Sequence, residues 1–355
     1  MRSSLAKPLH PICGRPMVLH VLDALSELPL EQVVVVVSYH SAEMTRTISA
    51  GAPPKLELHF VEQPLARGTG DAVAVALTEF PDDDMMSNAD VLVVPGDAPL
   101  LRPATLRALV DDHQEGDAAA TLLTAILDDP SGYGRVVRSN TGSVQRIVED
   151  GDATLAELEI AEVGTSVYCF RQSLLAPSLR RLRPNNAKGE YYLTDVVEGL
   201  THSGYLVGSL VVRDALEIAG VNDRAQLSFA ESELHARIND RWMRAGVTMT
   251  DPASCYLDAT VELDEDVTLL PNVHLQGVTR IGRGSVVGPS ARLVDTVVGQ
   301  RASIEFASAL GAVIGSDAHV GPFAALAPGS EVADGTETGP FFNGVGSRDA
   351  SPRAK

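Results

Sequence analysis

The first two thirds of the chain alternate between short apolar runs and amphipathic helical patterns. The runs at 33–37 and 91–94 are made almost entirely of valine and leucine, which is typical of fully buried strands of a parallel sheet. Helical patterns lie at 17–28, 70–77 and 103–113. This alternation predicts an α/β, doubly wound domain with a mostly parallel sheet.

Further strands are expected in the same region, at 120–127, 135–137, 144–149, 163–170 and 209–212. A long charged helical pattern then begins after Asn222. We therefore place a first domain at 1–222 and a linker helix at 223–246.

After Val247 the apolar pattern changes to a period of six. The apolar residues recur every six positions in four successive registers: Val261, Val267 and Val273; Ile281, Val287 and Leu293; Val298, Ile304 and Leu310; and Ile314, Val320, Leu326 and Val332. Glycine directly follows many of them, as at Gly282, Gly299 and Gly315. This pattern predicts hexapeptide repeats, in which three hexads form one triangular coil, over about four coils at 247–339. The segment 340–355 is rich in Gly, Ser, Asn and Pro, and we expect it to be a flexible tail.

Composition limits the classes of partner. The formal net charge of −19 argues against nucleic acid, so an anionic substrate would need local cations, backbone N–H groups or a metal. No apolar run approaches the roughly 20 residues of a membrane helix, and no export signal is apparent. The three cysteines are widely spaced and match neither a disulfide framework nor a zinc site. We expect a cytoplasmic protein that binds neither nucleic acid nor membranes.

Two loops carry candidate chemistry. Asp97 follows the apolar run 91–94, and the carboxyl ends of parallel strands are where such sheets bind ligands. Its carboxylate suits a hard divalent cation, although a turn or helix-capping aspartate is the alternative. The loop from Gln63 to Gly70 places glycines at 68 and 70 around Thr69, so its backbone could approach a base or phosphate.

Five segments together carry a family resemblance: Lys7 to Met17, Gly96-Asp97-Ala98-Pro99-Leu100, Gln63 with Gly68-Thr69-Gly70, Asp129-Pro130-Ser131-Gly132-Tyr133-Gly134-Arg135, and Asn185 to Asp195. With the hexads they resemble the bacterial bifunctional N-acetylglucosamine-1-phosphate uridylyltransferase/glucosamine-1-phosphate acetyltransferases over about residues 1–335. The resemblance implies a Rossmann-like nucleotidyltransferase domain, followed by a short left-handed parallel β-helix.

The resemblance also implies an activity and a site. The expected reaction is Mg²⁺-dependent transfer from UTP to N-acetylglucosamine 1-phosphate, giving UDP-N-acetylglucosamine and pyrophosphate, in a homotrimer. Lys7 would act on the phosphates, and Asp97 and Asn222 would hold Mg²⁺. The implied substrate ligands are Gln63, Gly68 and Thr69 for uracil, and Gly96, Gly134, Glu149, Gly164 and Asn222 for the rest of the substrates.

The chain departs from the family pattern in three places. Met1 stands at the methionine of the family's G-x-G-T-R-M loop, so we expect that the start was placed too late. Gly164 replaces the asparagine that contacts the N-acetyl sugar, which leaves another sugar 1-phosphate open. His319 does not match the acetyltransferase histidine, and no acetyltransferase activity is expected. The alternative to an enzyme is an impaired paralogue that binds sugar nucleotides or serves oligomerisation.

Overall fold

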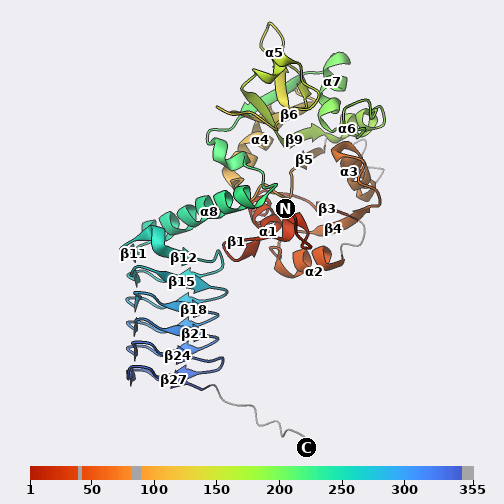
Figure 1. Cartoon of the computed structure of the whole chain (residues 1–355). Helices are drawn as coiled ribbons and strands as arrows, with labels where there is room; N and C mark the ends of the chain where they lie inside the picture. The colour runs from red at the N-terminus through yellow and green to blue at the C-terminus, as the bar shows by residue number, and fades with distance from the viewer. Residues whose placement is uncertain (39–41, 81–88, 346–355) are drawn as a thin grey trace, which may run out of the picture. The chain divides into compact units, whose positions relative to one another are not determined.

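A computed structural model describes residues 1–38, 42–80 and 89–345 (Figure 1). It divides into two compact units. The first contains residues 1–9 and 17–223, and the second contains 10–16 and the residues from Arg224 onward. The end of the first unit at Asp223 lies one residue beyond the boundary expected from the sequence. The assignment of 10–16 to the second unit was not predicted.

The first unit is an α/β domain. Its helices are η1 (Lys7–Leu9), α1 (Met17–Leu25), α2 (Ala42–Gly51), α3 (Thr69–Ala76), η2 (Leu77–Glu79), α4 (Pro103–Glu115), α5 (Leu155–Leu158), α6 (Gln172–Leu179), α7 (Thr194–His202) and η4 (Ala215–Ile218). Its strands are β3 (Val33–Ser38), β4 (Leu58–Gln63), β5 (Asp90–Val93), β6 (Ala120–Ile126), β7 (Arg135–Arg138), β8 (Val144–Val148), β9 (Glu162–Arg171) and β10 (Val207–Val211). The predicted elements of this region are all present, with ends shifted by a few residues.

The larger sheet of the first unit is mixed. Its described strands run in the order β10-β6-β9-β7-β8, with β5 paired to β9. β10 and β6 are parallel, as are β3 and β4 in a separate sheet, but β9 runs antiparallel to β5, β6 and β7. The α/β class is therefore confirmed, while the sheet is less parallel than expected, because β9 returns through the middle of the sheet.

The two valine-rich strands are less buried than their sequences predicted. Most residues of β3 and all residues of β5 are half-buried. Among the described strands, β3 pairs with β4 and β5 pairs with β9, and the two do not pair with each other. A strand with one hydrogen-bonded neighbour leaves its other edge accessible, which explains the partial exposure.

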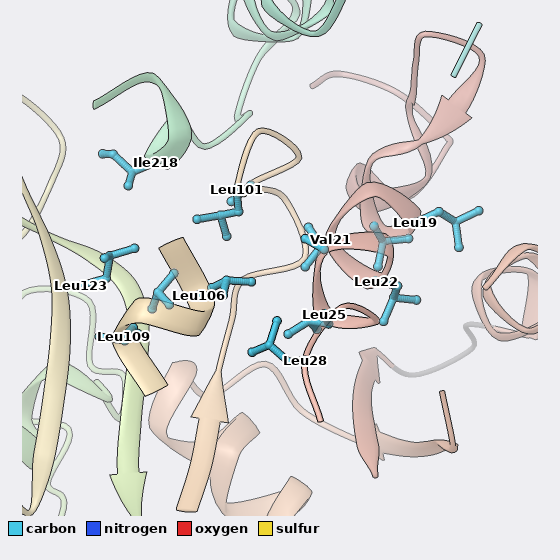
Figure 2. Packing of buried hydrophobic residues seen from close by; sticks show 14 of the residues in the cluster. Leu19, Val21, Leu22, Leu25, Leu28, Leu101, Leu106, Leu109, Leu123 and Ile218 are labelled. Carbon is cyan, nitrogen blue, oxygen red and sulfur yellow. The ribbon is translucent and has the colours of Figure 1, made fainter. Parts of the chain in front are cut away.

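Alternation along β9 divides the core of this unit in two. Val163, Val167 and Cys169 belong to one buried cluster, and Tyr168 and Phe170 belong to the other. This follows from the two-residue period of a strand, whose successive side chains point to opposite faces. Figure 2 shows the first cluster, in which leucines of α1 and α4 gather with Leu123 of β6 and Ile218 of η4.

The second unit is dominated by a parallel solenoid (Figure 1). It contains β1 (Pro11–Ile12), β2 (Arg15–Pro16), α8 (Arg224–Arg244), β11 (Thr248–Met249), η5 (Pro252–Ser254), β12 (Cys255–Leu257), β13 (Glu262–Leu263), β14 (Thr268–Leu269), β15 (Val273–Gln276), β16 (Arg280–Ile281), β17 (Val286–Val287), β18 (Arg292–Val294), β19 (Val297–Val298), β20 (Ser303–Ile304), β21 (Ser308–Leu310), β22 (Val313–Ile314), β23 (His319–Val320), β24 (Ala325–Leu326), β25 (Glu331–Val332), β26 (Glu337–Thr338) and β27 (Asn343–Gly344).

The solenoid confirms the hexapeptide-repeat prediction. Within the described residues its strands form three parallel sheets, of six, six and five strands, so it makes about five turns instead of the expected four. This is the arrangement of a left-handed hexapeptide-repeat β-helix. Nearly all the predicted aliphatic residues are buried, for example Val287, Ile304 and Val320 at 0% exposure.

Leu310 is the exception in the predicted ladder. It is 46% exposed, and Ala309 occupies the buried position instead. The interior residues Ile304, Ala309 and Ile314 follow one another at five-residue intervals, so this part of the coil is one residue shorter per side than a hexad. The strict period of six therefore mispredicts Leu310.

The hairpin of β1 and β2 packs inside the second unit. The backbone N–H of Cys13 donates to Glu231 Oε2 of α8 at 2.9 Å, and Ala259 N–H donates to the carbonyl of Cys13 at 2.9 Å. Gly14 has a φ of +73°, and a Cβ there would lie 2.2 Å from Cγ of Asp258. Only glycine allows this close approach.

The structure bears on two expectations, which concern the cysteines and membrane-spanning helices. All three cysteines lie in the described part of the chain, where they are buried and form no disulfide. Among the helices described, none combines the length and apolar character needed to cross a membrane.

Because the coils are closely stacked, we expect that a side chain at position 299 destabilises the solenoid. A Cβ there would lie 2.5 Å from the backbone nitrogen of Ser316 in the next coil. Gly299→Ala should therefore destabilise the solenoid by about 1–3 kcal/mol, measured by chemical denaturation together with hydrogen exchange of the solenoid amides. Gly339→Ala is the matched control, because a Cβ at Gly339 meets nothing within 4 Å. Equal stability losses in the two variants would contradict this account.

Candidate active site

The loop after β5 brings Asp97 beside the segment that carries Asn222. Val94 to Gly96 continue the chain from β5, and the backbone N–H of Val221 donates to the carbonyl oxygen of Asp97 at 3.1 Å. This bond holds two segments side by side that are over a hundred residues apart in the sequence. The two predicted metal ligands therefore lie in one place.

The ammonium group of Lys7 lies between these two side chains. Lys7 Nζ contacts Asp97 Oδ2 and donates a hydrogen bond to Asn222 Oδ1 at 2.7 Å. The Lys7 and Asp97 side chains are 35% and 24% exposed, so the pair remains accessible to solvent. The predicted catalytic lysine is thus part of the cluster, with carboxylate and amide oxygens as its partners.

The predicted uracil-binding loop is held rigidly by its own contacts. Gln63, at the end of β4, donates from Nε2 to Asp71 Oδ2 at 2.7 Å and to the carbonyl of Gly68 at 3.3 Å. Gly68 has a φ of +110°, and a Cβ there would lie 2.5 Å from the carbonyl oxygen of Tyr191. Asp71, which orients the Gln63 amide, is a residue that the sequence analysis did not single out.

The segment Asn185 to Asp195 connects this loop with the predicted sugar ligands. On one side, Gly70 N–H donates to Tyr191 O at 2.8 Å, and Leu193 N–H donates to the Thr69 hydroxyl at 3.0 Å. On the other side, the Thr194 hydroxyl donates to Glu149 Oε1 at 3.0 Å. The motif that is most specific in sequence therefore serves as the support between two groups of candidate ligands.

Gly134, Glu149 and Gly164 come together around Ile147. Gly164 N–H donates to the carbonyl of Gly134 at 2.9 Å. A Cβ at Gly134 would lie 2.8 Å from Ile147 Cγ2, and one at Gly164 would lie 3.2 Å from Ile147 Cδ1. The two glycines thus leave room for Ile147, and a Cβ at Gly134 would also lie 3.7 Å from Glu149 Oε1.

Gly96 has no comparable steric role. A Cβ there would meet Val18 Cγ2 of α1 at 3.8 Å, an ordinary van der Waals distance. It neighbours Asp97, and nothing in its surroundings requires glycine.

Carboxylates gather beside the predicted sugar ligands. Burial raises the pKa of Asp195 to about 6, and three other carboxylates add to this effect: Glu198, Glu149 and Asp152. Burial and the Glu149 carboxylate also raise the pKa of Tyr168, which lies in the core nearby. This end of the site is a collection of hydrogen-bond acceptors, whereas the Asp97 end holds the ammonium of Lys7.

Comparisons with known proteins agree with this arrangement. The profile of the nucleotidyl transferase family, described as "Nucleotidyl transferase", matches residues 2–246. The chain is also 40% identical over 354 residues to the "Bifunctional protein GlmU" of Carboxydothermus hydrogenoformans, covering 98% of this chain and 77% of that protein. The chain belongs to the GlmU family of nucleotidyl transferases.

Two other relatives of the same name show comparable coverage. The Kineococcus radiotolerans protein is 45% identical over 341 residues, which are 96% of this chain and 68% of that protein. The Listeria monocytogenes protein of serovar 1/2a is 39% identical over 341 residues, 96% of this chain and 72% of that protein. The similarity extends through both units of the chain.

The residues at Asp97 fit a magnesium ion. Two oxygen donors, Asp97 Oδ2 and Asn222 Oδ1, already face one cation, the ammonium of Lys7. Mg²⁺ commonly binds through one or two protein carboxylates and takes its other ligands from phosphates and water. In the described part of the chain no cluster of three His, Cys, Asp or Glu side chains could hold a metal alone. The site therefore suits an ion that arrives with a phosphate ligand.

The raised pKa of Asp195 predicts a pH-dependent stability. In the unfolded chain this carboxyl loses its proton near pH 4, whereas in the folded protein it keeps the proton up to about pH 6. The folded state binds more protons between these values, so the contribution of Asp195 to stability falls as the pH rises through this range. Asp195→Asn should be stabilised relative to wild type as the pH rises from about 4 to about 6, measured as the difference in Tm.

The control for this experiment is Asp117→Asn, because the Asp117 side chain is 96% exposed. Its Tm difference from wild type should not grow over the same pH range. A difference for Asp195→Asn that stays constant with pH would show that the carboxyl ionises normally.

Proposed function

We propose that this chain transfers the uridylyl group of UTP to N-acetylglucosamine 1-phosphate, giving UDP-N-acetylglucosamine and pyrophosphate. The observation that carries the proposal is the meeting of Lys7, Asp97 and Asn222 at one point of a nucleotidyl transferase domain. A cation and two oxygen donors at one point are what a reaction between phosphates requires.

In this proposal the loop Gln63 to Gly70 binds the base. Because Asp71 holds Nε2 of Gln63, the carbonyl oxygen of the same amide would accept the imide N–H of uracil. Backbone groups of Gly68 and Thr69 would complete the recognition, since glycine at 68 lets the chain come close to a ligand.

The sugar would lie against Gly134, Gly164 and Glu149. The Glu149 carboxylate accepts the Thr194 hydroxyl at 3.0 Å, so its position is fixed before substrate arrives. It would accept hydroxyl groups of the sugar, and the glycine backbones would bind other polar groups. Gly164 contributes only its backbone, so another sugar 1-phosphate is the alternative substrate.

The chemistry is a displacement at phosphorus. An oxygen of the sugar phosphate forms a bond to the α-phosphorus of UTP, and the bond to the bridging oxygen breaks and releases pyrophosphate. Asp97 and Asn222 would hold Mg²⁺, which when bound neutralises phosphate charge. Lys7 would stabilise the charge that spreads over the phosphate oxygens, and the base and sugar contacts would align the two substrates.

The solenoid would support this activity by assembling the chain as a homotrimer. His319 lies on a flat face of the solenoid, in register with Ser303 and Glu337 of the neighbouring coils. This placement supports a structural role for His319, and we propose uridylyl transfer without acetyl transfer.

Base selectivity tests the proposal directly. With N-acetylglucosamine 1-phosphate, the full chain should release pyrophosphate from UTP at least about tenfold faster than from CTP, ATP or GTP, because a mismatched imide edge leaves hydrogen-bonding groups unpaired. Asp97→Asn should abolish release. Equal rates with all four nucleotides would contradict the uracil assignment, and tight binding of UDP-sugar without turnover would favour the non-catalytic alternative. A rate with glucose 1-phosphate equal to the rate with N-acetylglucosamine 1-phosphate would contradict the assignment of the sugar.

The position of Lys7 gives a second prediction. Lys7→Met should lower kcat by about 100-fold, because a charge that stabilises the phosphates is lost. The same variant should bind Mg²⁺ more tightly than wild type when no nucleotide is present, because Lys7 no longer competes for Asp97 and Asn222. Calorimetry of the nucleotide-free protein measures this affinity.

Lys55→Met is the matched control, since Lys55 is exposed and pairs with Glu27 at 3.3 Å. Lys55→Met should change neither kcat nor the affinity for Mg²⁺. Weaker or unchanged Mg²⁺ binding by Lys7→Met would show that Lys7 does not compete with the ion.

A further inference from the structure

The side-chain amide of Gln63 is held in one orientation by its two partners. Its Nε2 donates to Asp71 Oδ2 at 2.7 Å and to the carbonyl oxygen of Gly68 at 3.3 Å. A carboxylate and a backbone carbonyl can only accept hydrogen bonds, so these contacts use both protons of the amide nitrogen. The group of Gln63 that remains for a ligand is its carbonyl oxygen, which is an acceptor.

Asp71 is the stronger of the two partners of Gln63. Its hydrogen bond is shorter by 0.6 Å than the bond to Gly68, and it joins the amide to a charged acceptor. Hydrogen bonds to an ionised group are about twice as strong as those between neutral groups. The carbonyl of Gly68 also accepts the backbone N–H of Ala72 at 3.2 Å, so it divides its accepting capacity. The orientation of the Gln63 amide therefore depends mainly on Asp71.

The Asp71 carboxylate is fixed on its other side by Arg67. Asp71 Oδ1 pairs with Arg67 Nη2 at 2.9 Å, while Oδ2 accepts from Gln63. The Asp71 side chain is only 12% exposed, and it lies in the first turn of α3, where a negative charge is favourable. The carboxylate thus bridges a surface arginine and the amide of Gln63, with one oxygen for each.

We propose that Asp71 determines the preference for uracil over cytosine, because it fixes which end of the Gln63 amide faces the base. The two bases differ at ring position 3, where uracil carries an N–H donor and cytosine an acceptor nitrogen. An acceptor oxygen on Gln63 binds the first and leaves the second without a partner. Asp71 is a positioning residue, since it acts through Gln63. The inference rests on the proposed function, which assigns the base to this loop.

Asp71→Asn tests the inference, because it keeps the size of the side chain and replaces the carboxylate with an amide. Arg67 can only donate, so the new amide would turn its oxygen to Arg67 and its NH₂ group to Gln63. This arrangement favours the reversed orientation of Gln63, whose own NH₂ group would then face the base and donate to the ring nitrogen of cytosine. The affinity for UTP should fall and that for CTP should rise, so that their ratio falls by about tenfold.

The affinities are measured by calorimetry on the full chain, with UTP or CTP and no sugar phosphate. Asp117→Asn is the matched control, because Asp117 Oδ1 also pairs with an arginine, Arg171, at 3.0 Å. It should leave the ratio of affinities unchanged. An unchanged ratio in Asp71→Asn would overturn the inference. An equal loss of affinity for UTP and CTP would also overturn it, because that result means that Asp71 only stabilises the loop.

The proposed function and this inference fail in different ways. A wild-type chain that binds UTP but releases no pyrophosphate contradicts the function, while the ratio of affinities still tests the role of Asp71. A wild-type chain that prefers UTP, together with an Asp71→Asn variant that keeps the same preference, contradicts the inference alone. A chain that binds neither nucleotide contradicts both.

Discussion

The site depends on one electrostatic contact, the ammonium of Lys7 between Asp97 and Asn222. The three residues come from three segments that are far apart in the sequence, and a single cation satisfies both oxygen donors. Two oxygens placed this close would be unfavourable without a positive charge between them. The contact therefore orders the segments before any substrate binds. A second cation that binds the oxygens of Asp97 and Asn222 must therefore displace the Lys7 ammonium, which then needs another partner.

The other parts of the candidate site are held in place mainly by hydrogen bonds of the backbone, and less by charged side chains. The segment Tyr191 to Thr194 is bound to the Gly68 loop on one side and to Glu149 on the other. Backbone bonds do not require side chains to lose rotamer freedom, so they fix geometry at a low entropic cost. The exceptions are three contacts between side chains: Thr194 with Glu149, Gln63 with Asp71, and Arg135 with Asp150.

The sequence was sufficient to predict the helices, strands and repeats, but not which of their residues contact one another. The period of six located the solenoid, because buried positions in a stacked coil must repeat regularly, but it failed at Leu310, where three interior residues follow at five-residue intervals. The valine runs predicted strands, but their burial depends on which strands pair beside them, and pairing is non-local. Likewise, the motifs indicated Gln63 and Glu149, while their hydrogen-bond partners Asp71 and Thr194 could not be found without the fold.

The two ends of the candidate site differ in charge. A chain with a net charge of −19 repels anionic substrates in general, so a site for phosphates needs a local cation, which Lys7 would supply in the proposed function. At the opposite end, burial together with neighbouring carboxylates raises the pKa of Asp195 to about 6. Such a group of carboxylates would be unfavourable for phosphate but would suit the hydroxyl groups of a sugar. In the proposed function, a sugar phosphate would therefore be attracted with its phosphate at Lys7 and its hydroxyl groups at the carboxylates.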